Sequence, residues 1–493
     1  MLSAAVVMVI ILLYETSFSR EAAQGHRIAR MYPIALVVPN SRSYYPHVES
    51  VAGSRPRTGL PPPTQEDSHV ARDDLEGVAA LAAGLDARLS EADTRLDSDY
   101  PGARTGRQPV HSVYVPAGRV HAGLAADWGR RALAALDEHA PEPADLAAAT
   151  GLGEAAVADA LPRVRAKLAE DPVEDLRVDL EDGYGDRGDE TEDTHVMAAA
   201  DALVADLAEG QAPAYFGTRM KGMEAAGRHR GVRSLTLFLQ TLMEGHGSLP
   251  DGLVITLPKI TSVEHVEAMV WLSEQLERRL DLPEGRLGFE LQIETPQSVM
   301  LNDGTAAVAR MIRAGAGRVT ALHYGTYDYS ASVGVPAAYQ SLAHPAADHA
   351  KAVMQVAAAG TGVWLSDGGS NVMPTGTTDE VRSAWGLHAG LVRRSMERGY
   401  YQGWDLHPHQ LVTRHLVTCV FYREAFAPAA ERLRAYLGQV SGNVVDEPAT
   451  AQALAAVLVA GLGCGALEET EVAVATGADT ATLVSMAHRR VGQ

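Results

Sequence analysis

Acidic side chains stand directly after several short apolar runs of this sequence, where they could bind a cation or act as acids and bases. Converging carboxylates suit a hard cation that keeps several waters, because the only cysteines are Cys419 and Cys464 and no obvious pair of histidine ligands accompanies the acids. Mg²⁺ is the first choice and Mn²⁺ the second, with Glu294 and Asp328 as the expected ligands. For any single acid the alternative is a residue that caps a helix or faces water. The acids are Asp179, Glu181, Asp182, Glu294 and Asp328.

Two basic residues, Arg219 and Lys259, also follow apolar runs. The planar guanidinium of Arg219 can hold a carboxylate through two parallel hydrogen bonds, so it is the expected catalytic and substrate-binding group. An ion pair between Arg219 and Glu181 or Asp182 is compatible with that role. Lys259 is a further substrate-binding candidate. Alternatively, its amine could form a Schiff base with a carbonyl substrate, although surrounding carboxylates would raise its pKa and disfavour this.

Gly325 and His407 complete the candidate binding residues. Gly325 stands shortly before Asp328 and lacks a Cβ, which permits close approach of a ligand to the backbone or simply a turn. His407 lies in the segment WDLHPHQ and could act as a base, while hydrogen bonding within the rim of the fold is the competing role.

Residues at these separations need a fold that brings the ends of distant strands together. From His111 onward, short β-branched apolar runs alternate with helical stretches, which is typical of repeated βα units. The pattern predicts an α/β fold, a (β/α)₈ TIM barrel, with an open doubly wound sheet as the alternative. In such a barrel the reactive groups lie at the C-terminal ends of the strands. The expected strands are 112–115, 176–180, 214–218, 253–257, 287–293, 319–324, 363–366 and 402–406.

Composition and periodicity divide the chain into an extension, a barrel and an appendage. Residues 1–90 lack sustained periodicity and contain a proline-rich stretch, which predicts a disordered extension or a start codon assigned too early. The apolar run at 2–14 is too short for a membrane span of about 20 residues. Residues 91–424 are the predicted catalytic barrel, with a helical insertion near 141–169. Residues 425–493 are helical by period and form a C-terminal lid.

Overall composition limits the partners and the compartment. The chain has 493 residues, of which 46% are hydrophobic and 21% charged, as is typical of a soluble globular protein. Its net charge of −20 argues against non-specific nucleic-acid binding, which needs clustered lysine and arginine. Two cysteines cannot make a disulfide framework, which indicates a reducing compartment. We therefore expect a cytoplasmic protein that acts on a small molecule, with neither nucleic acid nor membrane as a partner.

Seven blocks of the sequence resemble, in order, those of the family of HpcH/HpaI aldolases and citrate lyase β-subunits. This family includes the malyl-CoA lyase group of the phosphoenolpyruvate and pyruvate barrel superfamily. Each block alone is weak, and the conserved order gives the resemblance its specificity. The blocks are SVYVPAG (112–118), VDLEDGY (178–184), TRMKG (218–222), LPKI (257–260), QIETPQSV (292–299), HYGTYDYSASVG (323–334) and WDLHPHQ (404–410).

The resemblance implies a Mg²⁺-dependent enzyme that makes or breaks a carbon–carbon bond of a hydroxy acid or hydroxyacyl-CoA through a metal-stabilised enolate. On it, Glu294 and Asp328 match the metal ligands. Arg219 matches an arginine that contacts the substrate, and Glu181 and Asp182 match acids around the metal-bound waters.

The resemblance also implies a homo-oligomer, because family members often carry a C-terminal helical lid that reaches a neighbouring subunit. Asp446, in the segment NVVDEPATAQA, matches a lid aspartate that would act in trans. The chain departs from the family where a second aspartate after the sixth strand is Ser332, and in the block SDGGSNVMP after the seventh. These departures leave the carrier open, so the substrate is either an acyl-CoA or a free small organic acid.

Two rival functions remain open at this stage. One is metal-free Schiff-base aldol chemistry through Lys259. The other is a non-catalytic barrel that binds an organic acid or serves as a partner subunit, since a fold alone does not establish activity.

Overall fold

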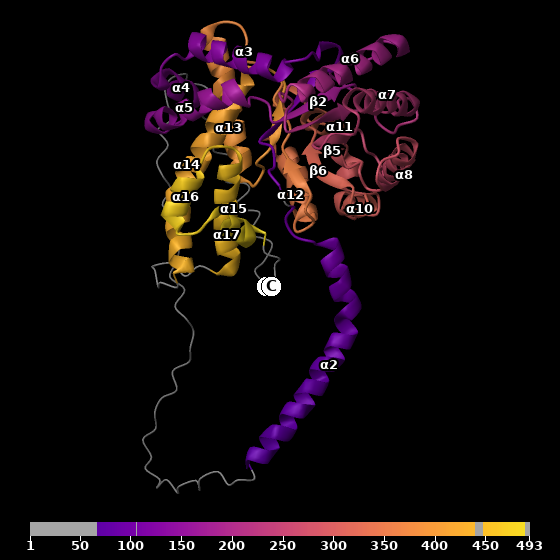
Figure 1. Cartoon of the computed structure of the whole chain (residues 1–493), viewed down its shortest axis with the longest axis vertical. Coiled ribbons are helices and arrows are strands. Elements are labelled where there is room, and N and C mark those ends of the chain that lie inside the picture. Colours follow the sequence, from indigo (N-terminus) through magenta and orange to yellow (C-terminus); the bar gives the residue numbers. More distant parts are fainter. Residues whose placement is uncertain (1–66, 105, 439–446, 489–493) are drawn as a thin grey trace, which may run out of the picture. The chain divides into compact units, whose positions relative to one another are not determined.

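The computed structural model describes residues 67–104, 106–438 and 447–488, in which parallel strands form a barrel surrounded by helices (Figure 1). The strand order is β7-β6-β5-β4-β3-β2-β1-β8, and every neighbouring pair is parallel. The predicted TIM barrel is therefore confirmed, and each expected strand overlaps an observed one. The strands are β1 (His111–Pro116), β2 (Asp175–Asp179), β3 (Tyr215–Arg219), β4 (Leu253–Leu257), β5 (Phe289–Ile293), β6 (Val319–Tyr324), β7 (Trp364–Ser366) and β8 (Gly403–Asp405).

The barrel closes between β7 and β8 through a thin seam. Ser366 and Gln402 form an isolated parallel bridge there. The amide of Asp367 donates to the carbonyl of Gln402 (2.8 Å), and the amide of Trp404 donates to the carbonyl of Gly368 (3.1 Å). By contrast, β2 and β3 pair along the whole of both strands. The seam is thus the weakest part of the strand pairing.

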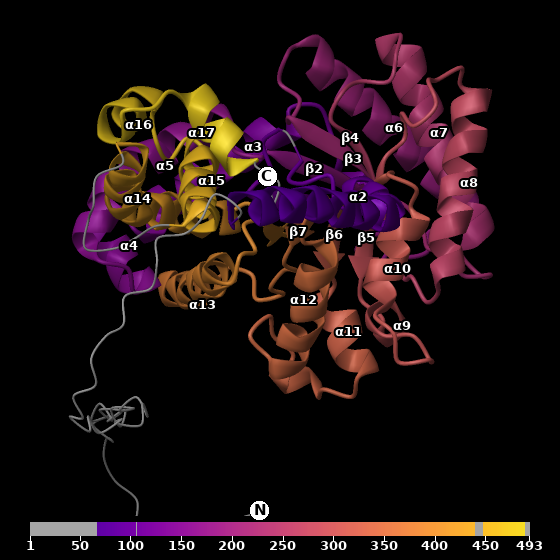
Figure 2. The ribbon, with the colours of Figure 1, turned by 90° about the horizontal axis from the view of Figure 1, so that it is seen from below.

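Helices cover the outside of the barrel, which explains why strands such as β2 and β5 are buried at every residue (Figure 2). Helix starts are marked by local signals; Thr377, for example, accepts a hydrogen bond from the Glu380 amide at the start of α13. The helices after β1 are α3 (Leu124–His139), α4 (Pro143–Thr150), α5 (Glu154–Glu170), α6 (Asp189–Ala208), α7 (Arg228–His246), α8 (Val263–Arg279), α9 (Pro296–Val299), α10 (Ala307–Ala314), α11 (Thr326–Ser332), α12 (Pro345–Ala358), α13 (Thr378–Glu397), α14 (Gln410–Leu437), α15 (Pro448–Gly463), α16 (Glu469–Thr476) and α17 (Thr480–Ala487), with 3₁₀ turns η1 (Ala117–Arg119) and η2 (Ala337–Tyr339).

Two helical additions enlarge the barrel. The crossover from β1 to β2 contains α3, α4 and α5, so the expected helical insertion near 141–169 is present. Helices α15 and α16 pack on α14, and α17 packs on α15, around a small core that includes Leu433, Leu458 and Leu483, which confirms the helical C-terminal appendage. Arg107 Nη1 donates to the Gly463 carbonyl (3.1 Å), so the end of α15 lies beside the segment that precedes β1. Within its own chain the appendage therefore contacts the end of the barrel opposite the predicted acids.

Helix α2 (Asp67–Asp99) corrects the prediction that the whole stretch up to residue 90 is irregular. Its aspartates and its two glycines, Gly77 and Gly84, are poor helix formers and obscured the helical pattern. The chain divides into two units, Met1–Ala80 and Leu81–Gln493, and α2 continues across the division. The apolar run at 2–14 lies outside the described residues. Among the helices of the described ranges, none combines the length and the apolar character needed to cross a lipid bilayer.

The inside of the barrel contains a charged network where branched apolar side chains usually dominate. Arg177 donates to Glu290 through Nε (3.1 Å) and Nη2 (3.0 Å) and also pairs with Asp175. Thr256 donates to Glu290, and His323 Nε2 lies 3.0 Å from Glu290 Oε2. All five side chains are buried. Burial alone would raise the pKa of Glu290, but the charges of Arg177 and His323 outweigh it and hold that pKa well below its usual range.

Candidate active site

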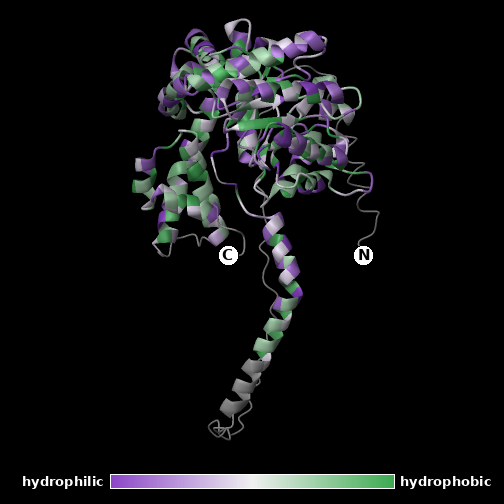
Figure 3. Cartoon of the chain, turned by 45° about the vertical axis from the view of Figure 1, so that its right-hand side comes forward, coloured by the Kyte–Doolittle hydropathy of each residue, from purple (hydrophilic) through white to green (hydrophobic). Residues whose placement is uncertain are grey.

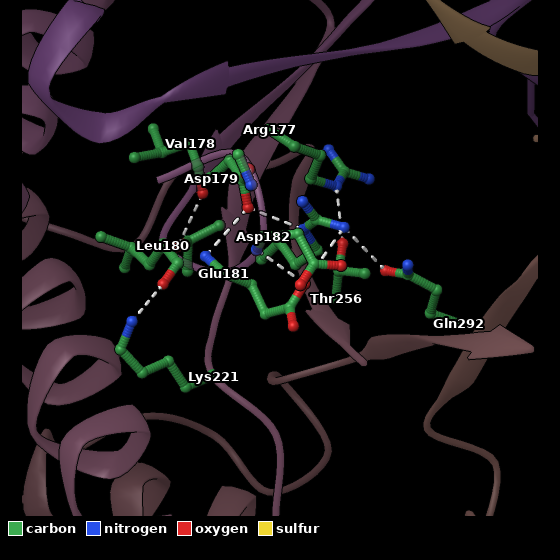
Figure 4. A network of polar contacts seen from close by, with 12 residues as sticks. Arg177, Val178, Asp179, Leu180, Glu181, Asp182, Lys221, Thr256 and Gln292 are labelled. Carbon is green, nitrogen blue, oxygen red and sulfur yellow. Dashed lines mark hydrogen bonds and ion pairs between the residues drawn. The ribbon is translucent and has the colours of Figure 1, made fainter. Parts of the chain in front are cut away.

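Asp179, the last residue of β2, shapes the loop that carries Glu181 and Asp182. Its buried carboxylate accepts hydrogen bonds from the amides of Glu181 (3.0 Å) and Gly183 (2.9 Å) and from Arg219 Nε (2.7 Å). A Cβ on Gly183 would lie 2.4 Å from Asp179 Oδ2, so this turn leaves no room for a larger residue. Figure 4 shows Glu181 and Asp182 close to Asp179. Asp179 thus acts as a positioning residue for the two acids that follow it.

Glu294 follows β5 and is held by hydrogen bonds to both of its carboxylate oxygens. Oε1 accepts from the backbone amide of Lys259 (2.7 Å), and Oε2 accepts from Gln292 Nε2 (2.5 Å). Lys259 has a φ of 52°, in the left-handed region that non-glycine residues seldom adopt. A Cβ on Gly325 would lie 2.3 Å from Glu294 Cβ. Gly325, predicted to bind substrate, therefore has a defined role in leaving room for Glu294.

Asp182 from the loop after β2, Glu294 from the end of β5 and Asp328 from helix α11 after β6 converge at one point. Each offers one carboxylate oxygen, and these oxygens all lie within 4.8 Å of one another. Mg²⁺ binds oxygen ligands at about 2.1 Å, so two ligand oxygens lie at most about 4.2 Å apart, and small movements of these side chains would let the three carboxylates share one ion. The donor set fits Mg²⁺ or Mn²⁺. The structure thus brings together the two predicted ligands and adds Asp182 to them.

The ammonium of Lys259 lies among the same carboxylates. Its Nζ is 2.8 Å from Asp182 Oδ2, 2.7 Å from Asp328 Oδ1 and 3.6 Å from Glu294 Oε2. A positive charge therefore already stands where the oxygens converge, which supports the inference that this position favours a cation. The ammonium and a divalent ion would compete for these oxygens.

Burial and mutual repulsion shift the ionisation of the cluster. Burial, and less strongly the charge of Asp328, raises the pKa of Glu294 to about 7. Burial, helped by the charges of Asp182 and Glu294, raises the pKa of Glu181 to about 8. Burial by itself would lower the pKa of Lys259, but the carboxylates of Glu294 and Glu181 outweigh it and raise that pKa above its ordinary value. Lys259 is consequently held as an ammonium, whereas Glu181 can carry a proton near neutral pH.

Arg219 ends β3 and is buried beside two aromatic rings. Its guanidinium carbon lies 5.0 Å from the centroid of the Tyr114 ring and 6.0 Å from that of Trp404. Nη1 donates to Gln292 Oε1 (3.4 Å) and lies 3.5 Å from Glu181 Oε2, so the predicted ion pair with Glu181 is present. These contacts orient a fixed cation next to the acidic cluster.

Two residues that support the site, Gln292 and Tyr114, were not singled out from the sequence. A usable signal was present, because Gln292 stands two residues before Glu294 and therefore shares its face of the strand and its direction. In β1, Tyr114 likewise stands two residues after Ser112, so these two side chains lie on the same face of that strand. Figure 4 shows Gln292 reaching toward the loop acids from β5, and Lys221 donating to the Leu180 carbonyl (2.8 Å) from the other side.

Other predicted residues lie apart from the cluster. His407 Nδ1 accepts from the amide of His409 (3.2 Å), and the two rings meet edge to face at 4.5 Å. Burial lowers the pKa of His407 to about 4, so the ring is neutral at physiological pH. Its substrate-binding role stays a prediction. Near it, Asp405 at the end of β8, which was not among the predicted site residues, is hydrogen-bonded to His111 Nδ1 (2.7 Å). Asp446 lies outside the described residues.

A cavity of about 280 Å³ adjoins the loops after β1 and β2. It is lined by Gly183 of the acid-bearing loop and by Tyr184, and its basic side chains are Arg119, Arg187 and His195. The guanidinium of Arg187 lies 5.2 Å from the centroid of the Tyr184 ring. Space and positive charge are therefore available next to the acidic cluster.

Comparisons with known proteins give a family and a set of similar folds. The family model described as "Domain of unknown function (DUF6986)" matches residues 89–491. None of the curated proteins matches the chain. Solved structures similar to it include the lead(II) and the magnesium/glyoxylate complexes of Haloferax volcanii malate synthase and an HpcH/HpaI aldolase from Desulfitobacterium hafniense DCB-2.

The similarity to these structures is low in sequence. The lead(II) complex is 16% identical with a TM-score of 0.39, and the match covers 68% of this chain and 87% of that one. The magnesium/glyoxylate complex is 14% identical with a TM-score of 0.40, covering 78% and 100%. The aldolase is 15% identical with a TM-score of 0.30, covering 49% and 80%. An HpcH/HpaI aldolase, the type of protein that the sequence blocks resemble, is thus among the similar structures.

Proposed function

This chain belongs to the family described as Domain of unknown function (DUF6986), and we propose that it is a metal-dependent carbon–carbon lyase or aldolase. Its substrate would be a small 2-oxo or hydroxy acid, free or as an acyl-CoA derivative. One observation carries the proposal: oxygens of Asp182, Glu294 and Asp328 lie within 4.8 Å of one another at the rim where barrel enzymes react.

Asp182, Glu294 and Asp328 would hold the divalent ion. When bound there, the ion would draw electron density from a substrate carbonyl oxygen. Lys259 would have to give up at least part of its contact with Asp182 and Asp328, and its long side chain allows this because the Nζ is tethered only by ion pairs. Glu294 would keep its orientation through the Lys259 amide.

Arg219 is the expected anchor for the substrate's carboxylate. Its charge is permanent, and the contacts of Nε with Asp179 and of the guanidinium plane with Tyr114 fix its orientation. An anionic substrate would otherwise be repelled by the surrounding acids, so Arg219 and the cation together make binding possible. The function therefore depends on positive charge that is held rigidly beside negative charge.

Glu181 is the expected group for proton transfer. Its pKa of about 8 lets it exchange a proton near neutral pH, as a general acid or base requires. It lies 3.5 Å from Arg219 Nη1 and 3.7 Å from Lys259 Nζ, so it faces the same space that the substrate would enter. Cleavage of a hydroxy acid needs a base for the hydroxyl proton, and condensation needs one for the α-proton.

The Schiff-base alternative is disfavoured by the surroundings of Lys259. A lysine attacks a carbonyl only as a neutral amine, and contacts with Asp182 and Asp328 stabilise the ammonium. Treatment with borohydride and pyruvate separates the two: a covalent adduct on Lys259 would support the Schiff base and contradict our proposal.

Binding of Mn²⁺, followed by calorimetry and electron paramagnetic resonance, tests the metal site directly. We expect the wild-type chain to bind one ion and Glu294→Gln and Asp328→Asn to lose most of the affinity. Glu267→Gln, an exposed acid on α8, is the matched control and should bind as the wild type does. Equal binding by all four proteins would overturn the assignment of the ligands.

Turnover of a panel of 2-oxo and hydroxy acids, with and without acyl-CoA, tests the reaction. We expect carbon–carbon cleavage or condensation that EDTA abolishes and Mg²⁺ restores. Metal binding with no turnover across the panel would favour the non-catalytic, organic-acid-binding alternative instead.

A further inference from the structure

Helix α2 presents a continuous apolar stripe to solvent. From residue 77 to residue 98 every side chain of this 33-residue helix is exposed. The exposure of its large apolar residues is high: Val78 57%, Leu81 72%, Leu85 58%, Leu89 49% and Leu96 59%. Hydrophobic residues recur along the helix in Figure 3. A leucine-rich stripe of this length marks an interaction surface.

The spacing of the stripe is that of a coiled coil. Val78, Leu85 and Ala92 stand seven residues apart, and Ala82, Leu89 and Leu96 form a second series with the same period. Along the chain the two series alternate at steps of four and three residues. The first series therefore occupies the d positions of a heptad, and the second series occupies the a positions. A repeat of 3.5 residues keeps an apolar seam facing a partner helix along a left-handed supercoil. Packing against a globular surface does not require this period.

The helix also needs a partner for its own stability. Gly77 and Gly84 stand in its interior, and each costs about 1 kcal/mol relative to alanine. A Cβ at either position would meet nothing within 4 Å, so the fold of the chain gives no steric reason for these glycines. Isolated helices in water are marginal even for good helix formers, and most helical stability comes from packing an apolar face.

The charges that flank the seam select both the partner and the direction. Arg88 and Arg95 occupy g positions, on one side of the seam, and Asp86 and Asp93 occupy e positions, on the other. In a parallel pair of identical helices, g of one helix faces e of the next heptad in its partner, so Arg88 meets the partner's Asp93. In an antiparallel pair, g faces g and e faces e, which would set arginine against arginine and aspartate against aspartate. The stripe is thus complementary to itself in the parallel arrangement.

We propose that residues 78–96 of α2 pair with the same helix of a second copy of this chain as a parallel coiled coil. The apolar series supplies the seam, and the pairing of Arg88 with the partner's Asp93 favours the parallel register over the antiparallel one. The interaction surface is separate from the acidic cluster, so it can be broken without touching the proposed site.

Site-directed crosslinking of the full-length chain tests the register. Leu89→Cys places a thiol at an a position, where identical residues of two parallel helices face each other. We expect mild oxidation to join two chains, as seen on a non-reducing gel. Ala87→Cys, at the outer f position of the same turn, is the matched control and should stay uncrosslinked. Failure of Leu89→Cys to crosslink, or equal crosslinking of both variants, would overturn the proposal.

Charge exchange tests direction and partner in the same chain. By sedimentation equilibrium, Arg88→Asp should weaken association at least about tenfold, and the double variant Arg88→Asp/Asp93→Arg should restore it, because the pair is then reversed. Leu85→Asp/Leu89→Asp should abolish the association through α2, while Ala87→Asp should leave it unchanged. These positions are exposed, so loss of folding does not confound the result. An unchanged mass for Leu85→Asp/Leu89→Asp would contradict the proposal, and so would a wild-type chain that stays monomeric and binds anionic vesicles through α2.

Discussion

Two groups of carboxylates lie along the same barrel, one deep inside it and one at its rim, and their surroundings differ. The inner group, Asp175 and Glu290, is fully buried, and Arg177 bonds to both of them. At the rim, the side chains of Asp182 and Asp328 are 52% and 45% exposed, and carboxylates outnumber the cations near them. The same residue types are thus neutralised in one place and left in excess in the other.

The difference separates structural charge from functional charge. Every strong partner of the inner carboxylates belongs to the protein, so nothing further can bind there without breaking a contact. At the rim, Asp182 and Asp328 share the ammonium of Lys259 and are about half exposed, so a cation from solution can join them. An acidic cluster is therefore informative about ligand binding only when its charge is not already balanced by neighbouring residues.

The largest effect is expected from Arg177→Met, which would break the inner network. It leaves Asp175 and Glu290 buried without their cation, which should lower the free energy of unfolding by about 3 to 5 kcal/mol. Chemical denaturation measures this loss. Arg310→Met, which removes an exposed ion pair with Asp303, is the control and should cost less than about 1 kcal/mol. If Arg177→Met also cost less than about 1 kcal/mol, the inner network would contribute no more to stability than an exposed ion pair does.

Gly325→Ala would displace Glu294, one of the rim carboxylates. The new methyl group would lie 2.3 Å from Glu294 Cβ, so the carboxylate must move, at an expected cost of about 1 to 3 kcal/mol. We expect weaker Mn²⁺ binding together with this loss of stability. Gly390→Ala, on α13, meets no atom within 4 Å and should change neither quantity appreciably. Unaltered Mn²⁺ affinity in Gly325→Ala would show that Glu294 need not be held in its present place.

Lys259→Met tests the competition at the rim. Removing the ammonium from between Asp182 and Asp328 should tighten Mn²⁺ binding about tenfold, or about 1.4 kcal/mol. Lys259→Arg retains the charge and should remain near the wild-type affinity. Both variants place a non-glycine residue in the same left-handed backbone conformation. The difference between their Mn²⁺ affinities, measured by calorimetry, therefore reports the effect of the side-chain charge. Weaker binding by Lys259→Met would show that Lys259 assists the ion and does not compete with it.

A last, pH-dependent effect concerns His415, a buried base outside both groups of carboxylates. His415 is buried, its Nε2 lies 2.9 Å from the Pro172 carbonyl, and burial lowers its pKa well below the usual value. Below about pH 6.5 the unfolded chain therefore binds a proton that the folded chain rejects, and stability falls with falling pH by up to about 1.4 kcal/mol per unit. Above that pH neither state is protonated and the contribution is constant.

His415→Gln removes this titration while retaining a side-chain donor. Denaturation midpoints measured between pH 7 and pH 5 should fall less steeply in the variant than in the wild type. Identical slopes would mean that His415 does not account for the loss of stability in acid.

The sequence predicted the barrel well because its strands are buried on both faces and so stand out as short apolar runs. It also located Glu294 and Asp328, since strand ends meet at one rim. It also predicted acidic surroundings for Lys259, but not the contacts of its ammonium with Asp182 and Asp328, because those depend on a left-handed backbone conformation that has no marker in the sequence. The inner network could also have been predicted. Arg177 lies two residues from Asp179, and Glu290 lies two residues from Gln292, so each shares a strand face with a residue of the site.

The thin seam between β7 and β8 is the place where we expect the barrel to open locally. A transient gap there costs few backbone hydrogen bonds and would admit solvent beside Trp404. The arc from β2 to β6, which carries the rim carboxylates, would stay paired while the gap opens. Among the strands, amide deuterium uptake should accordingly begin at 364–366 and 403–405. The barrel would then open at this one seam while its other strand pairs stay closed.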